Sequence, residues 1–495
     1  MVELDVITNI ASKRGFFFPT AEIYGAKAGF WTYGHLGVLM KRKFENLWRD
    51  YFLSLDNNFF EIEGSYILPK KVFEGSGHLS NFKDPMVECL KCKTRFRADS
   101  LVEDTTKKAV NDIKDMQIII SREKINCPKC GGEFGEVKFF NMMFDVKIGA
   151  MSEEEAYLSP ETAQNPFLSF KREFFSLREK MPLGLAMVGR AYRNEISPRQ
   201  GFFRLREFTQ AELQIFLDPK EIDKYDDWNK IKKNKVNALL EKKDKPSEVS
   251  LEDLNTKHKI PSYYLFLLDK MYNFYINKLM IPKQKIRFRQ LGEDEKAFYN
   301  KIHFDLELEL TSLGGFREVA GLHYRGDHDL LGHQKHSGMN LEVVSDGKKI
   351  LPHIIEVSFG VDRNIFALLD IFYKTDKERQ YFDFPASLAP FEVSVFPLVN
   401  KDGLYEKAKE VFDLLSPHYK TSFDFSGSIG RMYRRVDEIG VPAMITIDYD
   451  TLKDKSVTLR EIDTMKQIRV KISDLVKTIE KFLSGDKLEK LGKVV

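Results

Sequence analysis

Two pairs of cysteines carry the clearest metal-binding signal in the sequence. Cys89 and Cys92 form one CxxC pair, Cys127 and Cys130 form the other, and 34 residues separate the two pairs. Four thiolates at such spacing are typical of a structural zinc site, in which they fill all four tetrahedral positions and leave none open for catalysis. Four free thiols, or two disulfides, are the alternatives. The spacing favours Zn²⁺ as a structural ion.

A second signal is the arginine-rich stretch GRAYRNEISPRQGFFRLREFTQAELQIF, which spans residues 189–216. It holds five arginines, three glutamates and no lysine. Both ends alternate as half-buried strands do, and SPRQG between them has turn chemistry, so a hairpin is expected. A solvated polar face is the ordinary interpretation of such a pattern. Here, however, every basic residue is an arginine, and arginine is preferred where phosphate or carboxylate is bound by a planar, bidentate group. The sequence therefore predicts an anion-binding surface on one face of a sheet.

A third group of charged residues lies where a strand is expected to pass into a helix, near Gly360. Glu356 and Ser358 are two residues apart and therefore share a face of the strand. Arg363 falls in the first turn of the helix, whose N-terminus attracts anions. A local cap by Glu356 and a surface ion pair of Arg363 are the alternative.

Composition describes an ordinary globular protein with room for several domains. The 495 residues include 77 basic and 74 acidic side chains, for a net charge of +3, and 43% are hydrophobic. A nucleic-acid partner would therefore have to be held by local patches. The N-terminal residues lack a signal-peptide pattern and no stretch reaches the ~20 apolar residues of a membrane helix, so a cytosolic location is expected. The sequence contains neither a Walker A loop nor a GxGxxG fingerprint.

The elements that would position these groups can be read from periodicity. Strands are expected around the hairpin and at 285–291 and 301–310, and a helix at 36–53. Residues 220–259 are rich in Lys, Asp and Glu and are expected to be helical or partly loose. Strands and helices alternate after Pro390, which predicts a separate C-terminal α/β module.

Read together, these motifs resemble the class II aminoacyl-tRNA synthetases and, within them, the family of homodimeric glycyl-tRNA synthetases. RNE at 193–195 with REF at 206–208 is similar to the second motif of that class, and GVDR at 360–363 to the third. The family-specific resemblance lies in YLSPETAQ (157–164), HYRGDHDLLGH (323–333), SIGRMYRRVDEIGVP (428–442), the dimer-interface segment at 15–43 and the stretch SGHLSNFKDPMVEC (76–89). Departures occur at His35, Ser159, Asn165 and Asp362.

The resemblance implies an α+β fold with an antiparallel catalytic sheet. The catalytic domain would span residues 1–384, with a zinc-binding insertion at 88–131 and a helical insertion region at 218–300. An anticodon-binding domain would span 385–495. It also implies a cytoplasmic homodimer whose partners are tRNA(Gly), glycine and ATP, with no membrane or DNA partner.

The implied reaction joins glycine to ATP, releasing pyrophosphate, and then transfers glycine to tRNA(Gly). By resemblance, Arg193 and Arg363 are catalytic, and ATP with Mg²⁺ is held by Arg193, Glu195, Arg206, Phe208 and Arg363. The glycine pocket is expected to comprise Glu161, Glu212, Glu356, Ser358 and Arg325. Its carboxylates would repel one another unless a cation such as the glycine ammonium lay among them. A catalytically inactive, synthetase-like RNA-binding or accessory protein is the alternative, as is a synthetase for another small amino acid.

Overall fold

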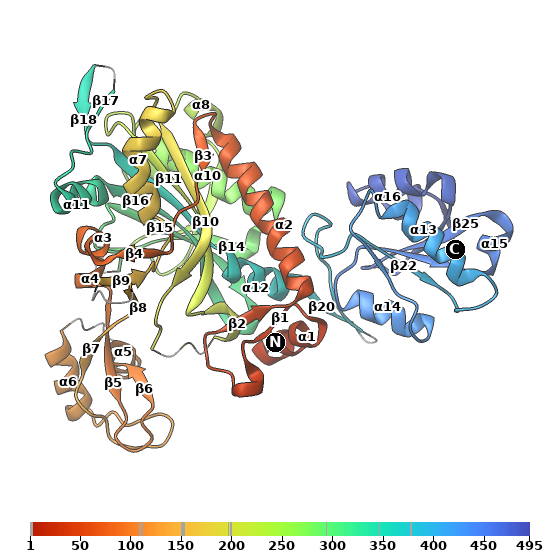
Figure 1. The fold of residues 1–495 in the computed structure, drawn as a ribbon, viewed down its shortest axis with the longest axis horizontal. Helices are drawn as coiled ribbons and strands as arrows, with labels where there is room; N and C mark the ends of the chain where they lie inside the picture. Colours follow the sequence, from red (N-terminus) through yellow and green to blue (C-terminus); the bar gives the residue numbers. More distant parts are fainter. Residues whose placement is uncertain are drawn as a thin grey trace.

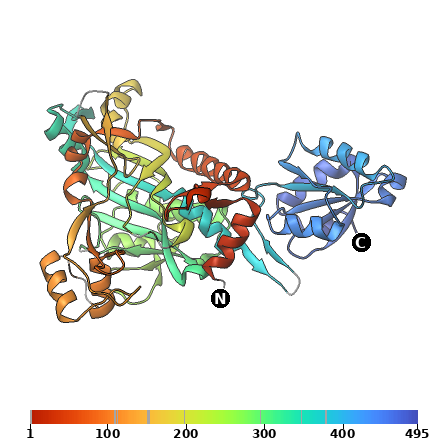
Figure 2. The same cartoon turned by 60° about the horizontal axis from the view of Figure 1, so that its bottom comes forward.

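The computed structural model shows a large sheet-and-helix body, a small insertion at one side and a separate C-terminal module (Figure 1). Figure 2 shows the insertion below the main sheet and the C-terminal module beyond helix α2 (His35–Phe52). The structure describes residues 3–107, 110, 112–149, 154–196, 198, 200–293, 295–345, 347–376 and 379–495.

The main body is built on an antiparallel sheet, as predicted. Among the described residues it has nine strands, in the order β13-β12-β14-β15-β16-β19-β11-β10-β3. The pairs from β14 to β10 are antiparallel, β3 and β12 join them in parallel, and β13 pairs antiparallel with β12 at the edge. The strands are β3 (Phe59–Glu61), β10 (Leu183–Tyr192), β11 (Glu207–Leu217), β12 (Lys235–Leu239), β13 (Ser247–Ser250), β14 (Ile286–Gln290), β15 (Ile302–Leu310), β16 (Gly315–Gly326) and β19 (His353–Gly360).

Helices cover one face of this sheet and leave part of the other face open. α2, α10 (Ser262–Asn273) and α12 (Val361–Phe372) pack against the odd-numbered residues of β11 and β19 in one continuous core. In α2 the buried residues recur every four positions, from Met40 through Phe44 and Trp48 to Phe52, which gives the helix a single apolar stripe. On the opposite face α7 (Gln164–Ser176) covers only one end. The uncovered remainder is where the polar side chains gather.

The predicted hairpin is confirmed, but its strands are shorter than the sequence indicated. β10 ends at Tyr192 and β11 begins at Glu207, paired in one continuous antiparallel register. Arg193, Glu195, Arg204 and Arg206 therefore lie in the connecting loop, where alternation no longer determines the direction of a side chain.

The segment expected to be helical or loose differs from that expectation. Residues 220–259 contain α8 (Trp228–Ile231) and α9 (Leu251–Thr256), but also β12 and β13, which extend the main sheet. Val236 and Ala238 of β12 are buried in the main core. Two inward apolar residues in a lysine-rich stretch are too few for periodicity to reveal a strand.

The insertion and the C-terminal module have cores of their own. In the insertion, β5 (Lys83–Glu88) pairs with β6 (Arg95–Arg97) and β7 (Lys138–Asn141), and α5 (Ala98–Thr106) and α6 (Ile113–Arg122) pack beside the cysteines. The C-terminal module combines a mixed sheet with α13 (Leu404–Leu415), α14 (Ile429–Asp437) and α16 (Leu475–Leu483), as predicted. Within the ranges given above, no helix has the length and apolar character needed to span a bilayer.

Candidate active site

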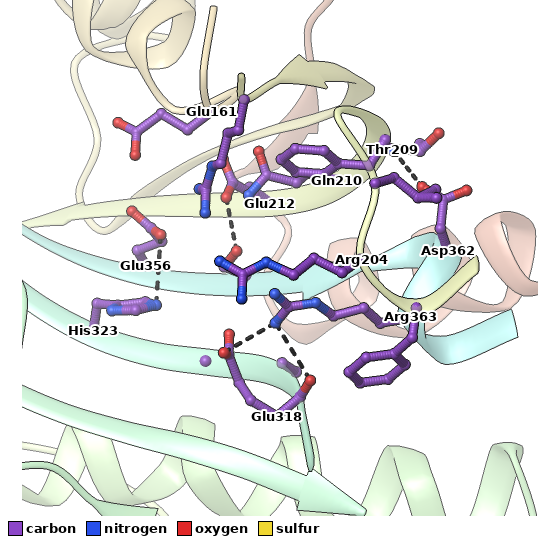
Figure 3. Close-up of a pocket in the computed structure, with 18 of the residues that line it drawn as sticks. Glu161, Arg204, Thr209, Gln210, Glu212, Glu318, His323, Glu356, Asp362 and Arg363 are labelled. Carbon is purple, nitrogen blue, oxygen red and sulfur yellow. Dashed lines mark hydrogen bonds and ion pairs between the residues drawn. The ribbon is translucent and has the colours of Figure 1, made fainter. Parts of the chain in front are cut away.

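A polar pocket opens on the uncovered face of the main sheet. Cross-strand register builds its floor, because Glu212 of β11 lies opposite Ser358 of β19, and Glu356 lies opposite His323 of β16. Figure 3 shows the side chains of Glu212, Glu356 and His323 converging from neighbouring strands. The lining residues are Glu161, Arg193, Glu195, Phe203, Arg204, Leu205, Phe208, Thr209, Gln210, Glu212, Tyr299, His303, Glu318, Ala320, Gly321, His323, Glu356, Ser358, Gly360, Asp362 and Arg363.

Three buried carboxylates form one end of the pocket. Glu161, Glu212 and Glu356 are only 4%, 1% and 3% exposed. Glu212 accepts hydrogen bonds from Thr162 Oγ1 (2.6 Å) and Ser358 Oγ (2.7 Å), which fix both of its oxygens. Glu161 accepts one from Gln164 Nε2 (2.8 Å). The structure thus brings Glu161, Glu212, Glu356 and Ser358 together, in the arrangement that a small ammonium group would fit.

Arg325 does not line this pocket. Its guanidinium, 0% exposed, donates to both carboxylate oxygens of Asp329 (2.7 and 2.9 Å), to Glu356 (2.6 Å) and to Glu161 (3.4 Å). The register shifts between Tyr324 and Gly326, so Arg325 is the extra residue of a β-bulge. A bulge re-aims a side chain, and here Arg325 points behind the carboxylates. The expectation that it contacts glycine is therefore not supported by its position.

The buried arginine decides the charge of the carboxylates in front of it. Burial would raise the pKa of Glu161, but Arg325 and His78 together hold that pKa well below its usual range. Burial raises the pKa of Glu356 to about 8, an effect that Arg325 opposes and that Glu212 and Glu161 strengthen. Burial and the charge of Glu161 also raise the pKa of Glu212. The carboxylate end therefore has one firmly ionised member and two that gain their charge more readily beside a cation.

Arginines form the other end of the pocket. The Arg193 guanidinium contacts two rings, 5.5 Å from the centre of Phe82 and 5.3 Å from that of Phe208, and its Nε donates to the Pro160 carbonyl (3.0 Å). Arg363 pairs with Glu318 (2.9 Å) at the start of α12. In Figure 3 the side chains of Arg204 and Arg363 extend into the pocket toward Glu318.

Of the residues expected to bind ATP, Glu195 lines the pocket but Arg206 does not. Glu195 lines the pocket and pairs with Arg204 (2.6 Å). Arg206 does not line it, since its guanidinium donates to the carbonyls of Glu195 (2.7 Å) and Ala28 (2.5 Å). Arg193 and Arg204 of this loop reach the pocket, while Arg206 ties the loop to residues 28–30.

Several lining residues were not among those expected from the sequence. His303 and His323 face each other across β15 and β16 with ring centroids 4.1 Å apart, and burial lowers the pKa of His323 well below its usual range. Glu318 belongs to the same strand as His323. Alternation in 301–310 and 315–326 could have identified these faces, but the polar residues there resemble a solvated surface. Asp362, a departure from the family motif, accepts from Tyr33 Oη and from the Thr209 amide (both 2.5 Å) and so links β11 to the N-terminal segment.

The four cysteines lie together at a separate site in the insertion. Their sulfur atoms all fall within 4.8 Å of one another, with Cys89 and Cys130 3.5 Å apart and Cys92 and Cys127 3.7 Å apart. Sulfurs bound to one zinc at 2.3 Å would be about 3.8 Å apart. The donor set and its spacing therefore fit a structural zinc ion.

Comparison with known proteins agrees with this architecture. The model of the tRNA synthetase class II core domain (G, H, P, S and T) matches residues 144–372, and that of the anticodon binding domain matches 392–482. A prolyl-tRNA synthetase from Cryptosporidium parvum, solved with L-proline and AMP, has a TM-score of 0.62 at 14% identity, covering 99% of this chain and 76% of that one. That likeness supports the fold alone.

The chain is also similar to curated relatives over nearly its whole length. A glycine–tRNA ligase of Methanothermobacter thermautotrophicus is 36% identical, with 95% of this chain and 98% of the relative covered. One from Aeropyrum pernix is 35% identical, with 98% of each covered. One from Methanococcus maripaludis is 34% identical, with 97% of this chain and 100% of the relative covered.

Proposed function

Because the chain belongs to the glycine–tRNA ligase family of class II aminoacyl-tRNA synthetases, we propose that it activates glycine with ATP and transfers it to tRNA(Gly). The observation that carries this assignment is a pocket with three buried carboxylates at one end and three arginines at the other. A glycine zwitterion fits such a polarity, its ammonium toward the carboxylates and its carboxylate toward the arginines and ATP. The relatives are all named as ligases, so an inactive accessory protein is not favoured.

In the first step, the glycine carboxylate would attack the α-phosphorus of ATP and displace pyrophosphate. The substrate supplies the nucleophile, so the protein has to position the reactants in line and stabilise charge. We assign Arg193 to the α-phosphate, since it reaches the pocket and makes no ion pair with any carboxylate among the described residues. Arg363 and Arg204 would hold the distal phosphates, with Phe208 stacked on adenine and Glu195 near its amino edge.

Glycine recognition would rest on Glu161, Glu212, Glu356 and Ser358. A larger amino acid would have to displace these hydrogen-bonded carboxylates, and the cost of leaving buried charges unpaired would exclude it. Arg325, expected to contact glycine, is better assigned as the cation that fixes Glu161 and Glu356 from behind.

Mg²⁺ and Zn²⁺ fit particular residues of the chain. Glu318 offers a 49%-exposed carboxylate beside Arg363, the oxygen ligand that Mg²⁺ prefers. Bound Mg²⁺ would neutralise phosphate charge. Cys89, Cys92, Cys127 and Cys130 would hold Zn²⁺, which would stabilise the fold of the insertion.

For the whole molecule, we propose a catalytic domain over 1–384 and an anticodon-binding domain over 385–495. The catalytic domain would include the helical insertion region at 218–300 and the zinc-binding insertion, which is expected at 88–131 from the sequence and extends in the structure through β5 and β7 to residues 83–141. We propose a cytoplasmic homodimer that binds tRNA(Gly) without a DNA or membrane partner. The expected dimer segment carries Ile23 and Tyr24 at 84% and 86% exposure, which supports a second copy as their cover. Light scattering during size-exclusion chromatography would test the dimer.

The decisive experiment is exchange of labelled pyrophosphate into ATP with glycine, alanine or serine and without tRNA. Exchange with glycine alone is expected, and Arg193→Ala should abolish it while the melting temperature stays unchanged. Exchange that depends on alanine or serine instead, or none from folded, zinc-loaded protein, would contradict the proposal.

A further inference from the structure

The insertion joins the main body through a two-chain neck that touches the pocket. The chain enters the insertion at Phe82 and returns at Met142, whose amide donates to the Phe82 carbonyl (3.2 Å). The adjoining residues Lys83 and Asn141 are the first pair of β5 and β7. Figure 1 shows these strands running from the main body into the insertion. The neck is therefore a paired, rigid element.

Both chains of the neck contact the loop that carries Arg193. The Arg193 guanidinium lies within cation–π distance of the Phe82 ring (5.5 Å) and of the Phe208 ring (5.3 Å). The Met142 carbonyl accepts a hydrogen bond from the Asn194 amide (2.7 Å). One side chain and one backbone group thus fix two successive loop residues.

Contacts with aromatic rings are well suited to hold an arginine whose guanidinium must bind an oxyanion. A carboxylate partner would hold the guanidinium but would also neutralise it and occupy its donors. Two aromatic rings fix the guanidinium plane through cation–π contacts and leave its edge and its charge available. Arg363, by contrast, is paired with Glu318.

The cysteine site is mechanically continuous with this neck. β5 begins directly after Phe82 and ends at Glu88, and Cys89 follows it. The Cys89 sulfur lies 3.5 Å from that of Cys130. A metal bound by the four sulfurs would therefore hold Cys89 in place at one end of β5, and Phe82 lies just before the other end.

We propose that the neck of the zinc-binding insertion is part of the ATP site, with Phe82 as a positioning residue for Arg193 and the loaded cysteine site as its anchor. This inference rests on the proposed function. It predicts that loss of the Phe82 ring weakens ATP binding more than glycine binding, because Phe82 contacts Arg193 directly but reaches Glu161 only through His78, whose ring lies 5.8 Å from that of Phe82.

The test compares Phe82→Leu with Phe82→Tyr and with Phe139→Leu, a control on β7 of the same sheet whose ring is 55% exposed. Phe82→Leu keeps an apolar side chain but removes the ring face. It should raise the KM for ATP by about five- to tenfold in glycine-dependent exchange, with a smaller rise in the KM for glycine and with zinc content and melting temperature unchanged. Phe82→Tyr should restore the KM for ATP. Chelation of zinc should shift it in the same direction as Phe82→Leu.

A Phe82→Leu variant with the wild-type KM for ATP would overturn the inference. So would an equal rise in the KM for both substrates, because that result indicates general loosening of the pocket. Direct titration of ATP into each variant gives a second readout that does not need turnover. If wild-type protein shows no exchange, the proposed function fails, and titration still decides whether Phe82 contributes to nucleotide binding.

Discussion

Replacement of Arg325 by methionine tests whether this arginine supports the pocket from behind or binds substrate. Its guanidinium is fully buried and paired with Asp329, Glu356 and Glu161. Removing the cation leaves three buried carboxylates without compensation, and breaking a buried pair in this way costs about 3–5 kcal/mol. For a domain of this size the melting temperature of the catalytic part should fall by roughly 4–6 °C.

The loss should depend on pH in a defined direction. The pKa of Glu161 is depressed in the folded protein, so its pairing stabilises the fold above the unfolded carboxyl pKa of about 4.3 and that stability is lost as the pH falls. Arg325→Met removes this contribution. The difference in melting temperature between variant and wild type should therefore be nearly constant from pH 8 down to about 5 and should shrink as the pH falls below about 4.3.

Differential scanning calorimetry over this pH range measures the effect. Arg95→Met is the matched control, because Arg95 pairs with Glu88 at the surface with 56% of its side chain exposed, and such pairs contribute about 0–1 kcal/mol. An Arg325→Met protein that melts within about 1 °C of wild type, yet needs far more glycine for exchange, would refute this reasoning. Such a result would instead support direct binding of glycine by Arg325.

Two further predictions concern single groups. Because burial raises the pKa of Glu356 to about 8, kcat/KM for glycine should rise with pH through about 8 as this carboxyl group ionises. The Glu356→Gln variant should lack this rise. A wild-type kcat/KM that does not change with pH would contradict the assignment. In the Cys127→Ser variant, metal analysis should find bound zinc reduced from about one ion per chain to near zero. The melting temperature of the insertion should also be lower. Full zinc content in this variant would exclude a four-cysteine site.

Periodicity predicted those parts of the site that lie within regular strands. Glu356 and Ser358 share a face of β19, and Glu212 lies on the matching face of β11, because side-chain direction alternates strictly there. The antiparallel core and the C-terminal module followed from the same signal. Spacing alone also predicted the cysteine cluster, because the CxxC pattern is local.

The residues that the sequence misplaced lie where alternation is broken. Arg325 is the extra residue of a bulge, and Arg206 belongs to a loop whose path depends on contacts with residues 28–30. Resemblance to a family motif identifies such residues but does not predict where their side chains point. His303, His323 and Glu318 were missed because a polar face toward a pocket and a polar face toward water have the same pattern.

The two ends of the pocket have opposite charge for a reason that bears on the chemistry. Glu212 and Glu356 come from the centres of β11 and β19, where the sheet buries them, and Glu161 comes from the segment just before α7, while the arginines come from a loop and a helix start at the strand ends. A zwitterion entering this field has one favourable orientation, with its carboxylate directed toward the arginines. Glycine would thus be oriented for attack on the α-phosphorus by the same charges that recognise it, so that binding and in-line positioning use one set of interactions.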